Sequence, residues 1–272
     1  MYSDIRHGRG KVSTRTNDIE RINEFNEFKS SFLRILSHEI RTPMNSIIGF
    51  TDLLNEDGFS RHDKALFINT IKDSSINLLN VIEELIYLAD IETNQIKPVE
   101  SICSLSHLFT ELLISCESIK QKRKKNDINF QINNNILKNN LTIFTDTKRL
   151  RKILMILLDN AVKYTENGNI DFGYIVRDNE SILFYVIDTG IGIPFENQEN
   201  VFLEFGSTEK TASVFKNGLG VGLTIAKGII EILGGKIWFQ SMPNEGTTFY
   251  FTIPIKMEPH NKTKSSSCSL LI

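Results

Sequence analysis

The chain has 272 residues, a formal net charge of -2, and ordinary apolar and charged fractions of 40% and 24%. This balance excludes the strong positive field of a protein that binds nucleic acid or an anionic membrane. No apolar stretch approaches the ~20 residues that cross a bilayer, and the polar N-terminus lacks the apolar core of a signal peptide. Three scattered cysteines, Cys103, Cys116 and Cys268, have no metal-ligand spacing and indicate idle thiols in a reducing compartment.

Two long helical patterns follow a polar segment, residues 1–17, which is expected to be a linker or disordered tail. Apolar residues recur every three or four positions from about Asn17 to Leu54 and again from about Arg61 to Gln95, with a break at Asn55–Gly58. The pattern predicts an antiparallel helical hairpin over residues 18–97. Because a lone hairpin leaves its apolar stripe half exposed, two copies are expected to form a dimeric four-helix bundle.

Beyond Pro98, helical and β-rich patterns alternate. Helices are expected from Ser104 to Lys124, from Thr147 to Tyr164 and from Leu219 to Leu233. The β-rich runs are INFQI, LTIF, IDFGYIV, SILFYVI, KIWFQ and TTFYFTIPI, and two connections, Arg177–Glu180 and Pro243–Gly246, indicate hairpin turns. These features predict an α+β class, with an α/β sandwich and a mixed sheet over residues 98–256. The polar residues 257–272 are expected to be a disordered tail.

A basic run, KQKRKK, occupies Lys120–Lys125. Cations suit the C-terminus of a helix because they oppose the negative end of its dipole. The run is therefore interpreted as a solvated helix end.

His38 is set apart by its position in the first helical pattern. At 100° per residue, Leu36, Ile40, Met44, Ile47 and Leu54 all fall within about 60° of Leu33, and these residues define the buried stripe. His38 lies about 140° away, on the exposed face that also carries Thr42. Glu39 could take or hold a proton, and Pro43 lies inside the helical run, where it removes a hydrogen bond at a cost of roughly 3 kcal/mol. A neutral imidazole is a competent nucleophile near neutral pH, although a plain surface histidine is the alternative.

Two glycine-containing segments suggest a nucleotide site. SILFYVIDTGIGIP is a strand that ends in Asp188, whose carboxylate could accept a hydrogen bond from an exocyclic amine, while Gly190 and Gly192 let the backbone approach a flat ring. GLGVGL opens the last helical pattern, where free N–H groups favour an anion. It contains Gly218, Leu219, Gly220, Gly222 and Leu223. Taken singly, each segment also fits a simple turn or a flexible loop.

The helix expected from Thr147 to Tyr164 carries two further candidates. Asn160 lies at the edge of its apolar stripe, and Lys163 lies on the same flank. An amide oxygen suits Mg²⁺, and an ammonium group can meet phosphate oxygens. For this helix alone, a boundary asparagine and a lysine that extends into solvent are an equally open interpretation.

Together these segments resemble the sensor histidine kinase family over residues 20–256. FLRILSHEIRTPMNSIIGF is similar to its histidine box, and LRKILMILLDNAVKYT is similar to its asparagine box. VIDTGIGIP and GLGVGL are similar to its two glycine boxes, and VFLEFGS, which contains Phe205, is similar to the phenylalanine box between them. The five motifs occur in the family's order and at familiar spacings.

The resemblance implies a HisKA-type dimerisation and phosphotransfer domain, followed by a GHKL-type ATP-binding domain of the kind shared with Hsp90, MutL and gyrase. His38 would take phosphate from Mg·ATP with help from Glu39, and would pass it to an aspartate on a response regulator receiver domain. Thr42 would serve a reverse phosphatase activity. The chain would work in the cytoplasm, alone or as the cytoplasmic part of a membrane-bound sensor.

The same resemblance implies roles at the nucleotide. Asn160 would hold Mg²⁺, Lys163 would meet phosphate, Tyr164 would flank the nucleotide and Asp188 would read adenine. Residues from about Phe195 to Gly218, Phe205 included, would form a lid over the ATP, and the second glycine box would meet its phosphates.

One position departs from the family pattern. Four residues before Asn160 the family usually has another asparagine, and the related ATPases have a catalytic glutamate, but this chain has Ile156. Isoleucine cannot activate water, which argues against one alternative, a conformational clamp driven by ATP hydrolysis. A second alternative is a non-enzymatic dimeric scaffold that binds a response regulator, and Ile156 is the only feature that favours it.

Overall fold

The computed structural model describes residues 33–93, 97–133, 136, 141–177, 180–202 and 220–255. These residues fall into two compact units, a helical hairpin that extends to Ala89 and an α/β unit that begins at Asp90. Among the described residues, no helix is both long enough and apolar enough to cross a membrane.

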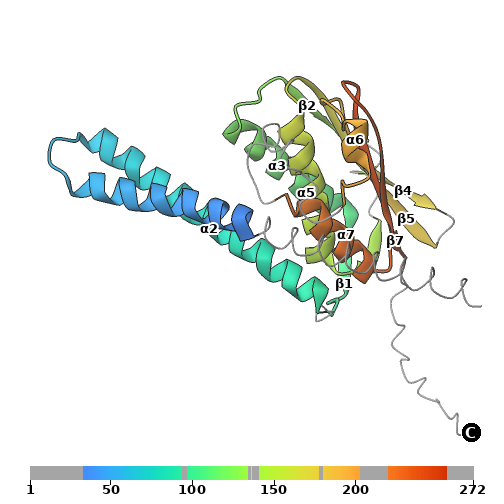
Figure 1. Cartoon of the computed structure of the whole chain (residues 1–272). Helices are drawn as coiled ribbons and strands as arrows, with labels where there is room; N and C mark the ends of the chain where they lie inside the picture. Colours follow the sequence, from blue (N-terminus) through green and yellow to red (C-terminus); the bar gives the residue numbers. More distant parts are fainter. Residues whose placement is uncertain are drawn as a thin grey trace, which may run out of the picture. The chain divides into compact units, whose positions relative to one another are not determined.

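The first unit is an antiparallel helical hairpin, drawn from blue to cyan in Figure 1. Its first helix covers residues 33–55, which we call the His38 helix, and α2 follows from Arg61 to Glu92. A reciprocal cap starts α2, because Ser60 N donates to Asp63 Oδ2 at 3.0 Å and Asp63 N donates to Ser60 Oγ at 3.2 Å. The predicted hairpin is confirmed over these ranges, whereas its expected residues 18–32 and 94–96 lie outside the described part of the chain.

The hairpin buries few side chains within one copy of the chain. In α2 the buried residues are Ser74 and Leu88. Large apolar side chains are exposed on both helices: Leu33, Met44, Ile48, Leu66, Ile68, Ile76, Leu79, Ile82 and Ile86. The expectation that Leu33 and Met44 are buried is wrong for the single chain, where they are 51% and 45% exposed. An apolar surface of this extent is typical of a face that binds a partner.

The second unit is built on a five-stranded sheet in the order β2-β4-β5-β7-β6. The strands are β2 (Ile128–Gln131), β4 (Gly168–Arg177), β5 (Ser181–Asp188), β6 (Ile237–Met242) and β7 (Gly246–Pro254). β2 and β4 run parallel and the other neighbours run antiparallel, so the predicted mixed sheet is confirmed. Two short strands, β1 (Ser101–Ser104) and β3 (Thr142–Thr145), pair separately.

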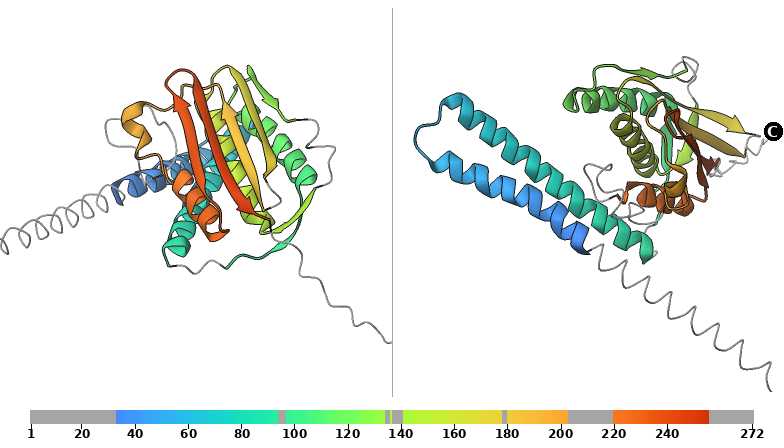
Figure 2. Two further views of the ribbon diagram at one scale, coloured as in Figure 1. Left: turned by 90° about the vertical axis from the view of Figure 1, so that its right-hand side faces the viewer. Right: turned by 45° about the horizontal axis from the view of Figure 1, so that its top comes forward.

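Three helices cover one face of this sheet, as Figure 2 shows: α3 (Leu105–Lys122), α5 (Thr147–Tyr164) and α7 (Gly222–Ile232). A stack of aromatic rings lies between the sheet and α3. Phe109 on α3 stacks on Phe172 and Phe184, and Phe184 stacks on Phe251 with 4.8 Å between centroids. All four are fully buried, so this layer is the core of the unit. A short helix, α6 (Phe195–Gln198), follows β5.

Three expectations for this unit need correction. β1 was not predicted, because only one of its four residues, Cys103, is buried. The last helix begins at Gly222 and not at Leu219. The basic run is only partly a solvated helix end: Gln121–Lys124 are exposed at the end of α3, whereas the side chains of Lys120 and Lys125 are only 17% and 13% exposed.

Candidate nucleotide site and phosphoacceptor histidine

His38 lies on the exposed side of its helix, as its position in the sequence predicts. Its side chain is 76% exposed, and its Nδ1 is 3.6 Å from Oε1 of the half-buried Glu39. One turn later, the exposed Thr42 donates its hydroxyl to the carbonyl of His38 at 3.1 Å. Pro43 has no N–H to continue the helical hydrogen bonds. The geometry presents an imidazole to solvent with one nitrogen beside a carboxylate.

In the second unit, Asp188 ends the central strand β5 on the helix-covered face. Side chains alternate along a strand, so Asp188 shares this face with the core residues Phe184 and Val186. Its residue is 7% exposed, and its Oδ1 accepts the backbone N–H of Gly190 at 2.9 Å. Burial raises the pKa of Asp188 to about 6, while the backbone N–H groups of Gly190 and Thr247 act in the opposite direction. The carboxylate is therefore held in place within a largely apolar surrounding.

The C-terminal end of α5 meets the loop that follows Asp188. Ile191 N donates to the carbonyl of Tyr164 at 3.2 Å. A side chain at Gly190 would place its Cβ 2.4 Å from the same carbonyl oxygen, so only glycine allows this approach. The contact joins Tyr164, at the end of the helix that also carries Asn160 and Lys163, to the Asp188 loop. Burial raises the pKa of Tyr164 to about 12, with smaller opposing contributions from Arg123, which lowers it, and Asp159, which raises it.

The same loop is fixed on its other side by the β6–β7 hairpin. Gly192 has a φ of 66°, and a Cβ there would lie 2.0 Å from the carbonyl oxygen of Met242. Ile193 N donates to Ser241 Oγ at 2.8 Å, and Ser241 Oγ is 2.9 Å from Thr247 Oγ1. Sequence reasoning missed Ser241 and Thr247, because only the strand register that pairs Asp188 with Thr247 reveals their place.

The second glycine segment leads into α7. Gly220 has a φ of 70°, and Gly222 and Leu223 form the first turn of the helix. A Cβ on Gly222 would lie 3.3 Å from Cγ2 of Ile156, so the isoleucine on α5 packs directly against the start of α7. This contact gives Ile156 a packing role at the junction of the two helices. Phe205, Gly218 and Leu219 lie outside the described residues.

Comparison with known proteins decides the family. Residues 28–94 match the model of the His Kinase A (phospho-acceptor) domain, and residues 145–257 match the model of the histidine kinase-, DNA gyrase B- and HSP90-like ATPase. The chain belongs to the sensor histidine kinase family. The chain is 34% identical over 236 residues to the circadian input-output histidine kinase CikA of Synechococcus elongatus, covering 84% of this chain and 30% of that protein.

Two further relatives of this histidine kinase core support the same family. The signal transduction histidine-protein kinase BarA of Escherichia coli is 32% identical over 245 residues, which is 89% of this chain and 26% of that protein. The full-length ShkA structure in complex with AMPPNP has a TM-score of 0.60 at 25% identity, covering 82% of this chain and 45% of that chain. The chain thus spans less than a third of the length of CikA and of BarA.

The residues of this histidine kinase core fit a magnesium ion that arrives with nucleotide phosphates. Among the residues that the structure describes, no group of three or more His, Cys, Asp or Glu side chains could hold a metal by itself. Asn160 offers one amide oxygen, and the neighbouring Asp159 is already bound by Arg123. Mg²⁺ usually keeps several waters and binds one or two protein ligands together with substrate phosphates. Among the described residues, Asn160 could therefore supply one amide oxygen to such an ion.

Proposed function

We propose that this chain uses ATP to phosphorylate His38 and then passes the phosphoryl group to an aspartate on a response regulator receiver domain. The observation that carries the proposal is the exposed imidazole of His38, on a helix that matches the phosphoacceptor family model. The match of the second unit to the ATPase family model supports ATP as the phosphate donor.

The geometry at His38 suggests which nitrogen reacts. Nδ1 lies toward Glu39, so an N–H at Nδ1 leaves the lone pair on Nε2 free for attack. The new bond joins Nε2 to the γ-phosphorus, and the bond from this phosphorus to the bridging oxygen breaks, so that ADP leaves. Glu39 takes the proton from Nδ1 as positive charge develops on the ring. The protein contributes mainly positioning and charge neutralisation, as is general for phosphoryl transfer.

The receiver aspartate then attacks the phosphorus and the N–P bond breaks, while Glu39 returns the proton to Nδ1, so that His38 is again a neutral imidazole. Thr42 lies one turn from His38 on the same exposed face, and its hydroxyl is already directed toward the helix backbone. We assign it to a phosphatase activity, in which it orients a water molecule that attacks the phosphoaspartate and releases inorganic phosphate. The receiver domain would dock on this face because His38 and Thr42 are both accessible there.

Around the nucleotide, Asp188 would accept a hydrogen bond from the adenine amine, next to the backbone of Gly190 and Gly192. Asn160 would bind Mg²⁺, Lys163 would meet the phosphates, and Tyr164 would flank the nucleotide. The first turn of α7, with Gly222 and Leu223, offers unpaired N–H groups to the phosphates, and the preceding Gly218, Leu219 and Gly220 belong to the same motif.

Two copies of the chain would form the working unit. The exposed apolar residues of both hairpin helices, such as Ile48 and Leu79, support a four-helix bundle made from two hairpins. A cytoplasmic location, where ATP and receiver domains are available, belongs to the same proposal.

The decisive experiment replaces the acceptor. We expect His38→Gln to abolish incorporation of phosphate from γ-labelled ATP, because an amide is not a nucleophile toward phosphorus. His62→Gln is the matched control, since His62 is also an exposed histidine of the hairpin. The label on the unmodified chain should be acid-labile and base-stable, as a phosphoramidate is.

Undiminished labelling of the His38→Gln variant would overturn the assignment. Release of inorganic phosphate without any phosphoprotein would instead support the clamp driven by ATP hydrolysis. A chain that fails to bind an ATP analogue would support the non-enzymatic scaffold.

A further inference from the structure

The basic run at the end of α3 has no role in the chemistry proposed above. α3 ends in a tight turn in which Lys124 N donates to Gln121 O and Lys125 N donates to Lys120 O, both at 3.1 Å. Lys124 has a φ of 56°, the left-handed conformation that this motif usually gives to glycine. The turn leaves Lys124 exposed and turns the side chain of Lys125 inward.

Lys125 completes the C-terminal end of α5. Its Nζ donates to the carbonyls of Lys163 at 2.7 Å and Thr165 at 2.8 Å, and lies 3.1 Å from Oε1 of Glu166. Carbonyls at the end of a helix lack intrahelical donors, and a cation there also opposes the negative end of the helix dipole. The ammonium group therefore caps a helix that belongs to a different part of the sequence.

Arg123 binds the same helix one turn earlier. Its NH2 lies 2.8 Å and 2.9 Å from the two carboxylate oxygens of Asp159. Asp159 directly precedes Asn160, so Arg123 binds α5 just before the segment Asn160–Tyr164, and Lys125 binds it at the segment's C-terminal end. The carbonyl of Tyr164 also receives the N–H of Ile191 from the Asp188 loop. The segment is thus fixed from α3 and from the loop at the same time.

We propose that Lys125 and Arg123 are positioning residues for the nucleotide, which hold the last turn of α5 so that Asn160, Lys163 and Tyr164 are aligned with Asp188. The inference rests on the proposed function, because it takes these side chains to bind ATP. Neither cation touches the nucleotide in this account, and both act through α5. Two residues of the basic run, Arg123 and Lys125, then support the ATP site, while Lys122 and Lys124 remain exposed at the surface.

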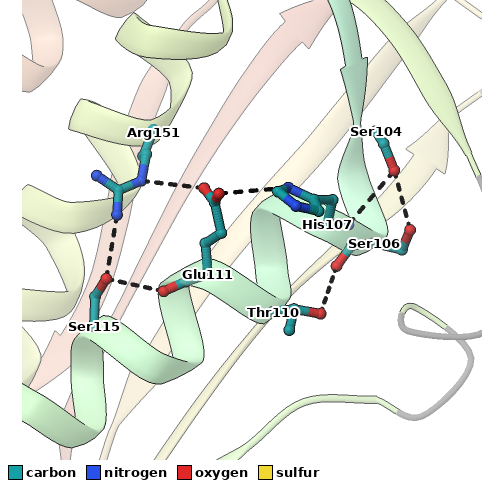
Figure 3. Close-up of polar contacts among 7 residues, drawn as sticks. All are labelled: Ser104, Ser106, His107, Thr110, Glu111, Ser115 and Arg151. Atoms are coloured by element: carbon teal, nitrogen blue, oxygen red, sulfur yellow. Dashed lines mark hydrogen bonds and ion pairs between the residues drawn. The ribbon is translucent and has the colours of Figure 1, made fainter.

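A second tie between the same helices provides an internal comparison. Figure 3 shows Arg151, near the start of α5, with its NH2 3.2 Å from Ser115 Oγ and its Nε 3.6 Å from Glu111 Oε2 on α3. Glu111 is in turn 3.5 Å from Nδ1 of His107. This network joins α3 to α5 at the end of α5 that lies away from Asn160–Tyr164. Its loss should weaken packing without moving the nucleotide-binding turn.

The test measures the dissociation constant of the ATP analogue AMPPNP by calorimetry on the full chain. Lys125→Met keeps the length of the side chain but removes its donors, and we expect the dissociation constant to rise about tenfold. Arg123→Gln breaks a partly exposed ion pair, and the expected rise is about threefold. Arg151→Met is the control for the tie between the helices, and Lys122→Met is the control for charge. We expect both controls to bind as the unmodified chain does.

Kinetics provide a second readout that a purely structural role would not move. In the Lys125→Met variant the KM for ATP should rise by the same factor as the dissociation constant, while the rate of autophosphorylation at saturating ATP should stay near that of the unmodified chain. A positioning role weakens nucleotide binding and leaves the chemistry of His38 intact.

Each outcome decides the proposal. Unchanged AMPPNP binding by Lys125→Met overturns it and leaves the proposed function standing. Equal losses of AMPPNP affinity in Lys125→Met and Arg151→Met also overturn it, because the effect would then come from the general packing of α3 against α5. If Lys125→Met does not fold, the dissociation constants of Arg123→Gln and Arg151→Met are compared. A rise in Arg123→Gln alone supports the proposal, and equal values in the two variants overturn it. An unmodified chain that binds no AMPPNP removes the proposed function itself, and this inference with it.

Discussion

The two units of this chain obtain their stability in different ways. In α5, seven of the 18 residues are buried, whereas α2 buries two of its 32 residues. The α/β unit closes its own core around Phe109, Phe172, Phe184 and Phe251, while the hairpin keeps an apolar surface for a partner. From this difference we expect nucleotide binding to depend on one folded chain, and the stability of the hairpin that carries His38 to depend on association with a second copy.

The largest effect should come from the core of the α/β unit. Phe184→Ala removes a fully buried ring that stacks between Phe109 and Phe251, and we expect it to cost about 3–5 kcal/mol of unfolding free energy. Chemical denaturation at several protein concentrations checks this, because a loss within one chain's own core is independent of concentration. A loss that shrinks as the protein is concentrated would contradict the comparison.

An intermediate effect is expected on the apolar face of the hairpin. Leu79 is 59% exposed in the single chain, and Leu79→Glu should weaken the dimer by about 1.5–3 kcal/mol if a second copy buries it. Sedimentation over a concentration series measures the shift toward monomer, with the neighbouring exposed Asn80→Glu as the charge-matched control. Nucleotide affinity should stay unchanged in both variants. A Leu79→Glu chain that dimerises as before would contradict the expectation that a second copy covers the apolar face of the hairpin.

The smallest effect concerns the ionisation of Asp188. Its pKa is raised to about 6, chiefly by burial, so the ionised form, which in our proposal accepts the adenine amine, is present above this pH and is lost as the pH falls through it. The ionised fraction falls about tenfold between pH 7 and pH 5, and AMPPNP affinity should weaken by the same factor.

Asp188→Asn serves as the reference, because the phosphates of the nucleotide titrate equally in both proteins. The informative quantity is the difference between the two pH profiles of the dissociation constant. Parallel profiles would show that the carboxylate does not take part in binding.

Much of this architecture could be predicted from local patterns. The boundaries of α5 agree with the expectation because Asp146 caps its start, accepting Arg149 N at 3.0 Å, and the apolar stripe runs unbroken to Tyr164. The exposure of His38 follows from its angular position around the helix, which is opposite to that of the apolar residues. Both features depend on residues within a few turns of each other.

Other features could not be predicted, because they depend on contacts between distant segments. β1 is recognisable only through its pairing with β3, about 40 residues later in the chain. Ser241 and Thr247 join the Asp188 loop through strand register, and Lys125 reaches α5 only because Lys124 adopts a left-handed turn. Hydrophobic periodicity contains no information about such turns.

The single tryptophan of the chain has a practical consequence. Trp238 lies on β6 and stacks on Tyr250 of β7 with 5.6 Å between ring centroids, so its environment depends on the edge of the sheet. Indole fluorescence should therefore follow the melting of the α/β unit alone, while far-ultraviolet circular dichroism follows both units. When both signals are recorded during the same unfolding experiment, the stability of the α/β unit can be distinguished from that of the hairpin.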